Sequence, residues 1–340
     1  MSRFGQFARV AGTYVPPGLV RAFGAPAAVF FHGVEHTTDD ARLQTNHHEV
    51  DDFVAMMRAL KASFDVRPLS ALDDVLKNPD ANRKTMFLMS DDGYANTLGL
   101  AADILDDLKL PWTLFVSTEH IDTGAPNPVF LARLFAFYAP SGSYDLPHFP
   151  EPLELGDGRE DVADAALGHL KTLDVADARE AIAAMASAMP DDSLQNLLTR
   201  FSSESFLDWD GVRALASRGV EIGAHAHWHW PMNSHQSDAT LREQAQIPKA
   251  RIEAEIGPCR YFAYPFGNIP DVGAAAWRAV REAGYEAAFT TLSGTLCGGR
   301  NRFLLPRYGL GPRDTALASL LPLLRAGNGR LRRFQSRLAS

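Results

Sequence analysis

The stretch TMFLMSDDGY, residues 85–94, decides the fold class, because an apolar strand runs directly into charged residues. An uncharged run such as 85–90 predicts a buried strand, and apolar residues recur at helical spacing over 98–108. A buried strand followed by an amphipathic helix is the repeating unit of α/β proteins. We therefore expect Asp91 and Asp92 at the carboxyl end of a parallel strand, where α/β barrels place their functional groups.

The same alternation continues on both sides of this stretch. Apolar runs predict strands at 27–31, 112–117, 220–223, 261–264 and 287–290, with a last strand near 303–308. Helical patterns lie around 50–60, 207–217, 240–256 and 272–283. Strands interleaved with helices imply a parallel sheet, and the number of units favours closure into a barrel over an open sheet.

Residues 140–206 interrupt this rhythm. Prolines mark an irregular start, and an acidic helical stretch with alanine-rich faces follows. Residues 151–210 hold 14 acidic and four basic side chains. We interpret 140–206 as a helical insertion on the barrel, with a solvated acidic face outside the catalytic framework. The expected organisation is an N-terminal extension over 1–26, a barrel over 27–310 that includes this insertion, and a C-terminal helix and basic tail over 311–340.

Charge excludes some classes of protein. The 340 residues carry 33 basic and 41 acidic side chains, a net charge of −8, which argues against a general nucleic-acid binder. No apolar run approaches the length of a membrane span. The first apolar stretch is interrupted by Arg9 and makes a poor secretory signal, so we expect a cytoplasmic protein.

The ends of the chain are basic. Residues 325–340 contain five arginines and no acid, with Leu331, Phe334 and Leu338 at helical spacing. This pattern is typical of a short helix lying on a membrane surface and predicts weak membrane contact. The alternative is a frayed, solvated tail. The sequence does not indicate an oligomeric state.

Asp91 and Asp92 form the first of three candidate clusters. Neighbouring side chains of an extended chain diverge, so one carboxylate can bind a metal while the other acts as a base. The alternative is structural, because Asp-Asp-Gly is common in turns and Asp commonly caps helices.

Histidines form the second cluster, at His225, His227 and His229. A single helical turn would place His225 and His229 on one face, at a spacing that suits a metal. The third cluster is FAYPFG, residues 262–267, which is either an ordinary turn or a turn that aims a backbone N–H and aromatic faces at a sugar.

In this order, the clusters resemble the polysaccharide deacetylase family (NodB homology, carbohydrate esterase family 4). That family's Thr-Phe-Asp-Asp-Gly motif corresponds to MSDDG at 89–93, and its His-Ser/Thr-x-x-His motif to HAHWH at 225–229. Its Arg-Pro-Pro-Tyr-Gly motif has a variant in AYPFG at 263–267. The resemblance covers roughly residues 27–310 apart from the insertion.

The resemblance implies an α/β fold, a distorted (β/α) barrel that is TIM-like with about seven strands and a helical insertion. It implies a divalent metal on Asp92, His225 and His229, with zinc as the first choice and cobalt, nickel or manganese as alternatives. Asp91 would be the general base. The oxyanion and the substrate would be contacted by Phe266, through its backbone N–H, and by Tyr264, Pro265, Tyr94 and Trp209.

The sequence departs from the family pattern at three positions. The arginine that braces the base falls on Ala263, and the Ser/Thr of the histidine motif falls on Ala226. The late Leu-x-His that supplies an acid reads Leu-Pro-Arg and ends at Arg307, which is no ordinary proton donor. Our hypothesis is that His32 is the acid. The alternative is that His32 is a hydrogen-bonded structural residue, and His227 is the second candidate for the acid.

The function expected from these residues is metal-dependent removal of N-acetyl or other acyl groups from an amino sugar. The substrate would be a polysaccharide, an oligosaccharide or a lipid-linked glycan. One alternative is a barrel that keeps the metal site but only binds glycans, which the missing arginine and histidine favour. Another is a deformylase or deacetylase of a lipid-linked amino sugar at the cytoplasmic membrane face.

Overall fold

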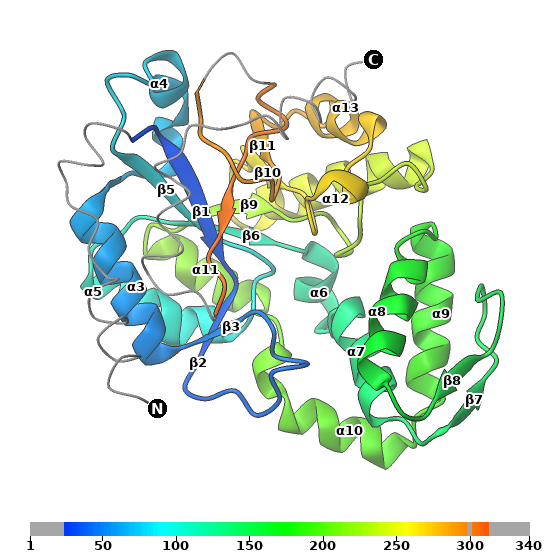
Figure 1. Ribbon diagram of the computed structural model, residues 1–340. Coiled ribbons are helices and arrows are strands. Elements are labelled where there is room, and N and C mark those ends of the chain that lie inside the picture. Colours follow the sequence, from blue (N-terminus) through cyan, green and yellow to red (C-terminus); the bar gives the residue numbers. More distant parts are fainter. Residues whose placement is uncertain (1–23, 298–300, 313–340) are drawn as a thin grey trace.

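A parallel sheet forms the centre of the computed structural model, which describes residues 24–297 and 301–312. Its strand order is β11-β10-β9-β6-β5-β1-β12, and β4 pairs additionally with β5 (Figure 1). The strands are β1 (Ala27–Phe31), β4 (Asp65–Val66), β5 (Thr85–Ser90), β6 (Thr113–Val116), β9 (Glu221–Ala224), β10 (Tyr261–Ala263), β11 (Ala287–Phe289) and β12 (Tyr308–Gly309).

The sheet curls into a distorted barrel that a short C-terminal segment closes. Leu305 bridges to Phe289 at the end of β11, and Tyr308 pairs with Val29 of β1. The predicted (β/α) barrel is therefore confirmed. The strand expected near 303–308 is reduced to an isolated bridge and the two residues of β12, because this segment must pair first with one edge strand and then with the other.

Helices cover the outer face of the barrel (Figure 1). Helix α3 shows why they form where the spacing predicted, since it buries Phe53, Met57 and Leu60 against the sheet while Asp51 and Asp52 face outward in its first turn. The others are α4 (Leu72–Lys77), α5 (Ala102–Asp107), α6 (Thr118–Thr123), α11 (Trp209–Ser217), α12 (Asp238–Glu255) and α13 (Ala274–Glu282), and α3 spans Val50–Ser63. Single turns occupy Leu69–Ala71, Thr97–Ala101, Ser202–Glu204 and Ile269–Asp271.

Two small strand pairs were not expected from the sequence. Strand β2 (Gly33–Glu35) pairs in parallel with β3 (His47–Glu49), just beyond the carboxyl end of β1. Strand β7 (Gly142–Tyr144) forms an antiparallel hairpin with β8 (Leu153–Leu155). Each strand has three residues, which is too short for an alternating pattern to be recognised.

The helical insertion has an apolar core of its own. It comprises α7 (Pro128–Tyr138), α8 (Arg159–Leu170), α9 (Val175–Ser187) and α10 (Asp191–Arg200), which stand beside the barrel in Figure 1. Helix α7 packs against α8 and α9, so the packed unit begins about ten residues before the predicted boundary at 140. Trp228 and Trp230 of the barrel reach into this second core and join the two parts.

No helix among the described residues is long and apolar enough to cross a membrane. Most of the predicted N-terminal extension and the basic segment 325–340 lie outside the described residues.

Candidate active site

Asp92, His225 and His229 meet at the carboxyl end of the barrel. Asp92 is the second residue after β5 and lies in the left-handed region, with φ of 74°. Its Oδ1 lies 3.2 Å from Nε2 of His225 and 3.1 Å from Nε2 of His229. All three side chains are buried, and their ligand atoms lie within 4.8 Å of one another.

The two histidines reach this point differently from the prediction. Residues 225–230 form an irregular loop after β9 and not a helical turn. Ala226 takes a φ of 64°, and this left-handed residue folds the loop so that the rings of His225 and His229 lie 5.0 Å apart. The small side chain at 226 is fully buried.

The donor set fits a divalent cation. Nδ1 of His225 lies 2.8 Å from the Ala263 carbonyl oxygen, which only accepts, so Nδ1 carries the hydrogen and Nε2 presents a lone pair. Oδ1 of Asp92 also presents lone pairs, is buried and has no hydrogen-bond partner among the described residues. Ligand atoms of a tetrahedral zinc site lie about 3.3 Å apart, close to the spacing here. A cation between the ligand atoms would remove the repulsion between the lone pairs of His225 Nε2 and Asp92 Oδ1.

Asp91 is held by a residue that the sequence analysis did not assign. Nη1 and Nη2 of Arg307 donate to the two carboxylate oxygens of Asp91, at 2.7 and 2.8 Å. Arg307 is fully buried, and its Nε donates to the Thr290 carbonyl oxygen. Burial is the largest single effect and would raise the pKa of Asp91, but the charge and hydrogen bonds of Arg307, together with the charges of His225 and His32, outweigh it and lower the pKa, so Asp91 is ionised.

Arg307 therefore performs the bracing that the family pattern places at position 263. It lies in the segment that closes the barrel, between its contacts with β11 and β1. The only sequence signal was an arginine at the position where a late histidine was expected. Its role depends on closure, which brings residues 216 positions apart into contact.

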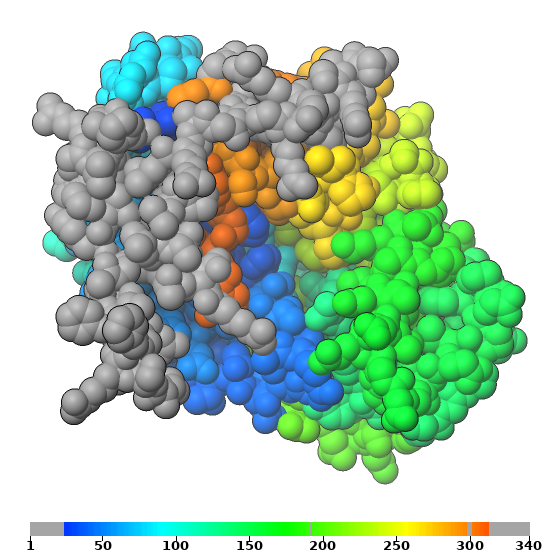
Figure 2. Space-filling model, in the orientation of Figure 1, coloured from blue at the N-terminus to red at the C-terminus, as the bar shows by residue number. Residues whose placement is uncertain are grey.

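A pocket of about 310 Å³ opens over these groups. In Figure 2 the surface is hollowed where the green insertion meets the barrel. Its walls come from both parts of the molecule. The barrel supplies His32, Asp91, Asp92, His225, His229, Phe266 and Thr291, and the insertion side supplies Asn127, Val129, Phe130, Arg133 and Glu204. The expectation that the insertion lies outside the catalytic framework is wrong, because α7 and the turn at 202–204 pack over the barrel mouth.

Phe266, the candidate donor to the oxyanion, lies in the turn after β10. It lines the pocket with a φ of 59°, and its ring lies 5.1 Å from that of His229. Its carbonyl accepts from the Thr291 hydroxyl, while its N–H makes no hydrogen bond to another described residue. Nζ of Lys171 sits 3.5 Å from the centre of the ring and pairs with Asp271, which anchors the aromatic side chain from the insertion.

His32 also lies in the pocket, at the end of β1. Burial lowers the pKa of His32, although the charges of Asp92 and Asp91 oppose this shift. Its imidazole is therefore neutral at pH 7 and carries no spare proton.

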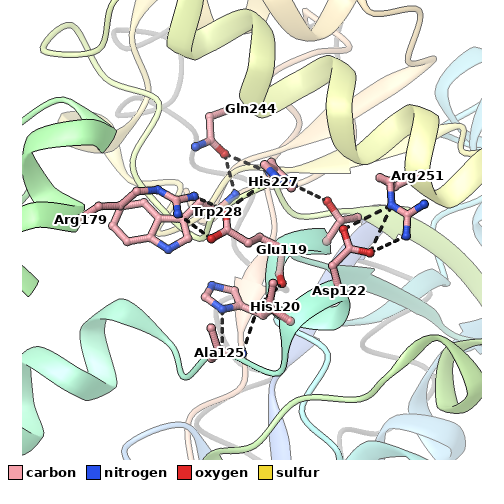
Figure 3. A network of polar contacts seen from close by, with 11 residues as sticks. Glu119, His120, Asp122, Ala125, Arg179, His227, Trp228, Gln244 and Arg251 are labelled. Atoms are coloured by element: carbon pink, nitrogen blue, oxygen red, sulfur yellow. Dashed lines mark hydrogen bonds and ion pairs between the residues drawn. The ribbon is translucent and has the colours of Figure 1, made fainter. Parts of the chain in front are cut away.

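His227 is not part of the pocket. Its Nδ1 lies 2.9 Å from the Thr118 hydroxyl, and its Nε2 lies 3.6 Å from the carboxylate of Glu119, which also binds Arg179 of the insertion (Figure 3). Gln244 of α12 accepts from the backbone N–H of His227 and Trp228. His227 thus links α6, α9 and α12, and the fallback hypothesis that it is the acid is contradicted by its position.

Three predicted substrate contacts are also structural. Tyr264 is fully buried and its hydroxyl donates to the Phe303 carbonyl, while the Trp209 indole donates to Asp122. Pro265 shapes the turn before Phe266 and does not line the pocket. Tyr94 does line the pocket, where it stacks on Phe206. In the sequence, aromatic residues that pack in the interior could not be distinguished from aromatic residues that would contact a sugar.

Comparisons with known proteins agree with this architecture. Residues 152–288 match the family model described as polysaccharide deacetylase. The fold is similar to the deacetylase PplD of Streptococcus pyogenes in complex with acetate, with a TM-score of 0.59, 12% identity, and coverage of 88% of this chain and 98% of that one.

Two further structures are similar. A polysaccharide deacetylase from Bacillus cereus gives a TM-score of 0.53 at 13% identity, covering 88% of this chain and 69% of that one. IcaB from Ammonifex degensii gives 0.53 at 14% identity, covering 88% and 97%. At these identities the similarity establishes the fold alone. No curated protein matches the sequence.

Proposed function

Because residues 152–288 match the polysaccharide deacetylase family, a family of hydrolases that act on amide bonds, we propose that this chain removes an N-acyl group from an amino sugar with a divalent metal. The observation that carries the proposal is the pairing of two sites in one pocket. Asp92, His225 and His229 form a set suited to a cation, and Asp91 stands beside it as a braced base.

Asp92, His225 and His229 would hold the ion, which would polarise the acyl carbonyl and make water more acidic. Asp91 accepts the proton of the attacking water, since it lines the pocket and its lowered pKa keeps it ionised. Arg307 holds the carboxylate in one orientation, which keeps the base in the geometry that attack requires.

The Phe266 N–H donates to the oxygen that becomes negatively charged as water adds. Preorganised donors of this kind contribute roughly 3 kcal/mol each. The Phe266 N–H is available for this role, because it makes no hydrogen bond to another described residue. The Lys171 ammonium on the Phe266 ring keeps the turn in place from the insertion side.

Removal of metal tests the proposal directly. We expect wild-type protein to release acetate from N-acetylated oligosaccharides, to lose that activity on dialysis against a chelator, and to regain it with Zn²⁺ or Co²⁺. Acetate in the supernatant is the measurement, and calorimetric titration with Zn²⁺ gives the metal stoichiometry. Binding of metal without acetate release over a broad panel of amino sugars would favour the glycan-binding alternative.

The missing arginine at position 263 no longer favours the glycan-binding alternative, since Arg307 binds Asp91 in place of that arginine. The other reason, the missing late histidine, concerns the acid that protonates the leaving amine. Lipid-linked substrates, membrane contact through residues 325–340 and a cytoplasmic location stay predictions.

The hypothesis that His32 is this acid makes a specific prediction. Because burial lowers the pKa of His32 below its ordinary value of 6.5, the protonated form predominates only in more acidic solution, and the alkaline limb of kcat/KM would lie there. The His32→Ala variant should then lose that limb along with most of the rate. A pH–rate profile of the variant that keeps both would exclude His32 as the acid.

A further inference from the structure

Glu204 and His47 form a buried pair in the wall of the active-site pocket. Glu204 belongs to the turn at 202–204 that ends the insertion, and His47 begins β3. Oε1 of Glu204 lies 3.2 Å from Nδ1 of His47. The two residues are only 4% and 1% exposed, and neither atom has another partner among residues 24–297 and 301–312.

The surroundings of His47 require an additional proton in this pair. Its Nε2 lies 3.1 Å from the Ser203 carbonyl oxygen, which can only accept, so Nε2 carries a hydrogen. In a neutral imidazole, Nδ1 would then present a lone pair to the lone pairs of an ionised Glu204. Two buried acceptors at this distance repel, whereas a proton between them satisfies both. The pair therefore holds a proton, on Nδ1 of His47 or on Oε1 of Glu204.

The chain makes room for this arrangement at Gly33. A Cβ at that position would overlap the His47 ring, and the Gly33 N–H donates to the Asn46 carbonyl just before His47. The pairing of β2 with β3 thus holds the His47 imidazole beside Gly33 and in contact with Glu204.

The pair also lies close to the reacting groups. Glu204 lines the same pocket as Asp91, Asp92 and His225. Tyr94 lines this pocket too, and its ring lies 4.7 Å from that of His47. His47 does not itself line the pocket, but it contacts Glu204, which does.

We propose that Glu204, backed by His47, is the catalytic residue that protonates the departing amine. This role rests on the proposed function and supplies the acid that the arginine at position 307 cannot provide. The carbon–nitrogen bond breaks, its electron pair stays on nitrogen, and the proton held by the pair moves to that nitrogen. The proton that Asp91 took from water is released to solvent, and the pair takes up one from solvent to complete the cycle.

The leaving group provides a sharp test. An amine cannot depart as its strongly basic anion and needs the acid, whereas 4-nitrophenolate is weakly basic and departs unprotonated. We expect Glu204→Gln to lower kcat/KM about 100-fold or more for acetate release from an N-acetylated chitooligosaccharide. On 4-nitrophenyl acetate the same variant should remain close to wild type. Its amide N–H can donate to Nδ1 of His47, so packing and metal affinity are retained.

Two further variants complete the design. His47→Gln should show the same difference between amide and ester, and it decides the matter if Glu204→Gln fails to fold. Glu180→Gln is the matched control, because Glu180 pairs with His148 at 2.9 Å on the exposed side of the insertion. That variant should match wild type on both substrates. Thermal unfolding and Zn²⁺ titration check that each variant is folded and binds metal.

Each result supports or overturns the role of Glu204. Equal losses on amide and ester, or no loss on the amide, would overturn it. A difference between amide and ester in His32→Ala that is absent in Glu204→Gln would assign the proton to His32 and overturn it as well. Failure of the proposed function is distinguished by the wild-type protein, which would then hydrolyse the ester but release no acetate from any N-acyl sugar.

Discussion

Asp91→Asn should lower kcat/KM for deacetylation by about 10²- to 10⁴-fold, the range that a positioned general base contributes. An amide cannot take the proton of the attacking water, and its NH₂ group would face the donors of Arg307. Unlike Glu204→Gln, this variant should lose activity on amide and ester alike, because water attacks in both reactions. Initial rates on both substrates are the measurement.

Metal binding separates the two neighbouring aspartates. Asp91→Asn should keep its Zn²⁺ stoichiometry in calorimetry, since Asp91 is not part of the cation site. The matched variant Asp92→Asn should lose both activity and tight metal binding. Loss of metal in Asp91→Asn, or retained metal in Asp92→Asn, would contradict the division of roles between base and ligand.

Arg307→Met should destabilise the protein by about 3–5 kcal/mol at neutral pH, because it leaves the Asp91 carboxylate buried without its cation. Denaturant unfolding measures this loss. The wild-type contribution is present above the ordinary carboxyl pKa and is lost as pH falls through the lowered pKa of folded Asp91. The difference in the free energy of unfolding between wild type and Arg307→Met should therefore become smaller as pH falls, since Asp91 becomes neutral in the variant.

The pH dependence of activity should also change in Arg307→Met. Without Arg307, burial raises the pKa of Asp91, so the base is ionised only at higher pH and the acidic limb of kcat/KM moves upward. The double variant Asp91→Asn with Arg307→Met removes both charges and should recover much of the stability but none of the activity. Stability losses that simply add would show that the two residues do not act as a pair.

Much of the barrel could be predicted from local pattern. The runs at 27–31 and 85–90 became β1 and β5 with those bounds, and α12 and α13 lie within two residues of their predicted ends. Continuous apolar runs are a strong signal when both faces of a strand are buried, as they are here. Strands β2 and β3 were missed because three residues carry no usable periodicity, and their pairing depends on the chain between them.

The site residues were likewise only partly predictable from the sequence. Asp92, His225 and His229 could be identified because each directly follows a predictable strand or lies within five residues of one, and parallel strands end at one edge. His227 and Trp209 could not be excluded, because the direction of a side chain in an irregular loop depends on what packs against it. Glu204 had no signal beyond its charge in an acidic segment.

The sequence by itself determined the alternation of strands and helices, the position of the acids and histidines at the strand ends, and so the resemblance to polysaccharide deacetylases and the candidate ligands. These properties depend on neighbours in the chain. Only the tertiary structure decided that Arg307 braces Asp91, that the insertion walls the pocket, and that Glu204 meets His47. Each of those contacts joins residues from distant segments, and barrel closure and helix docking alone bring such residues together.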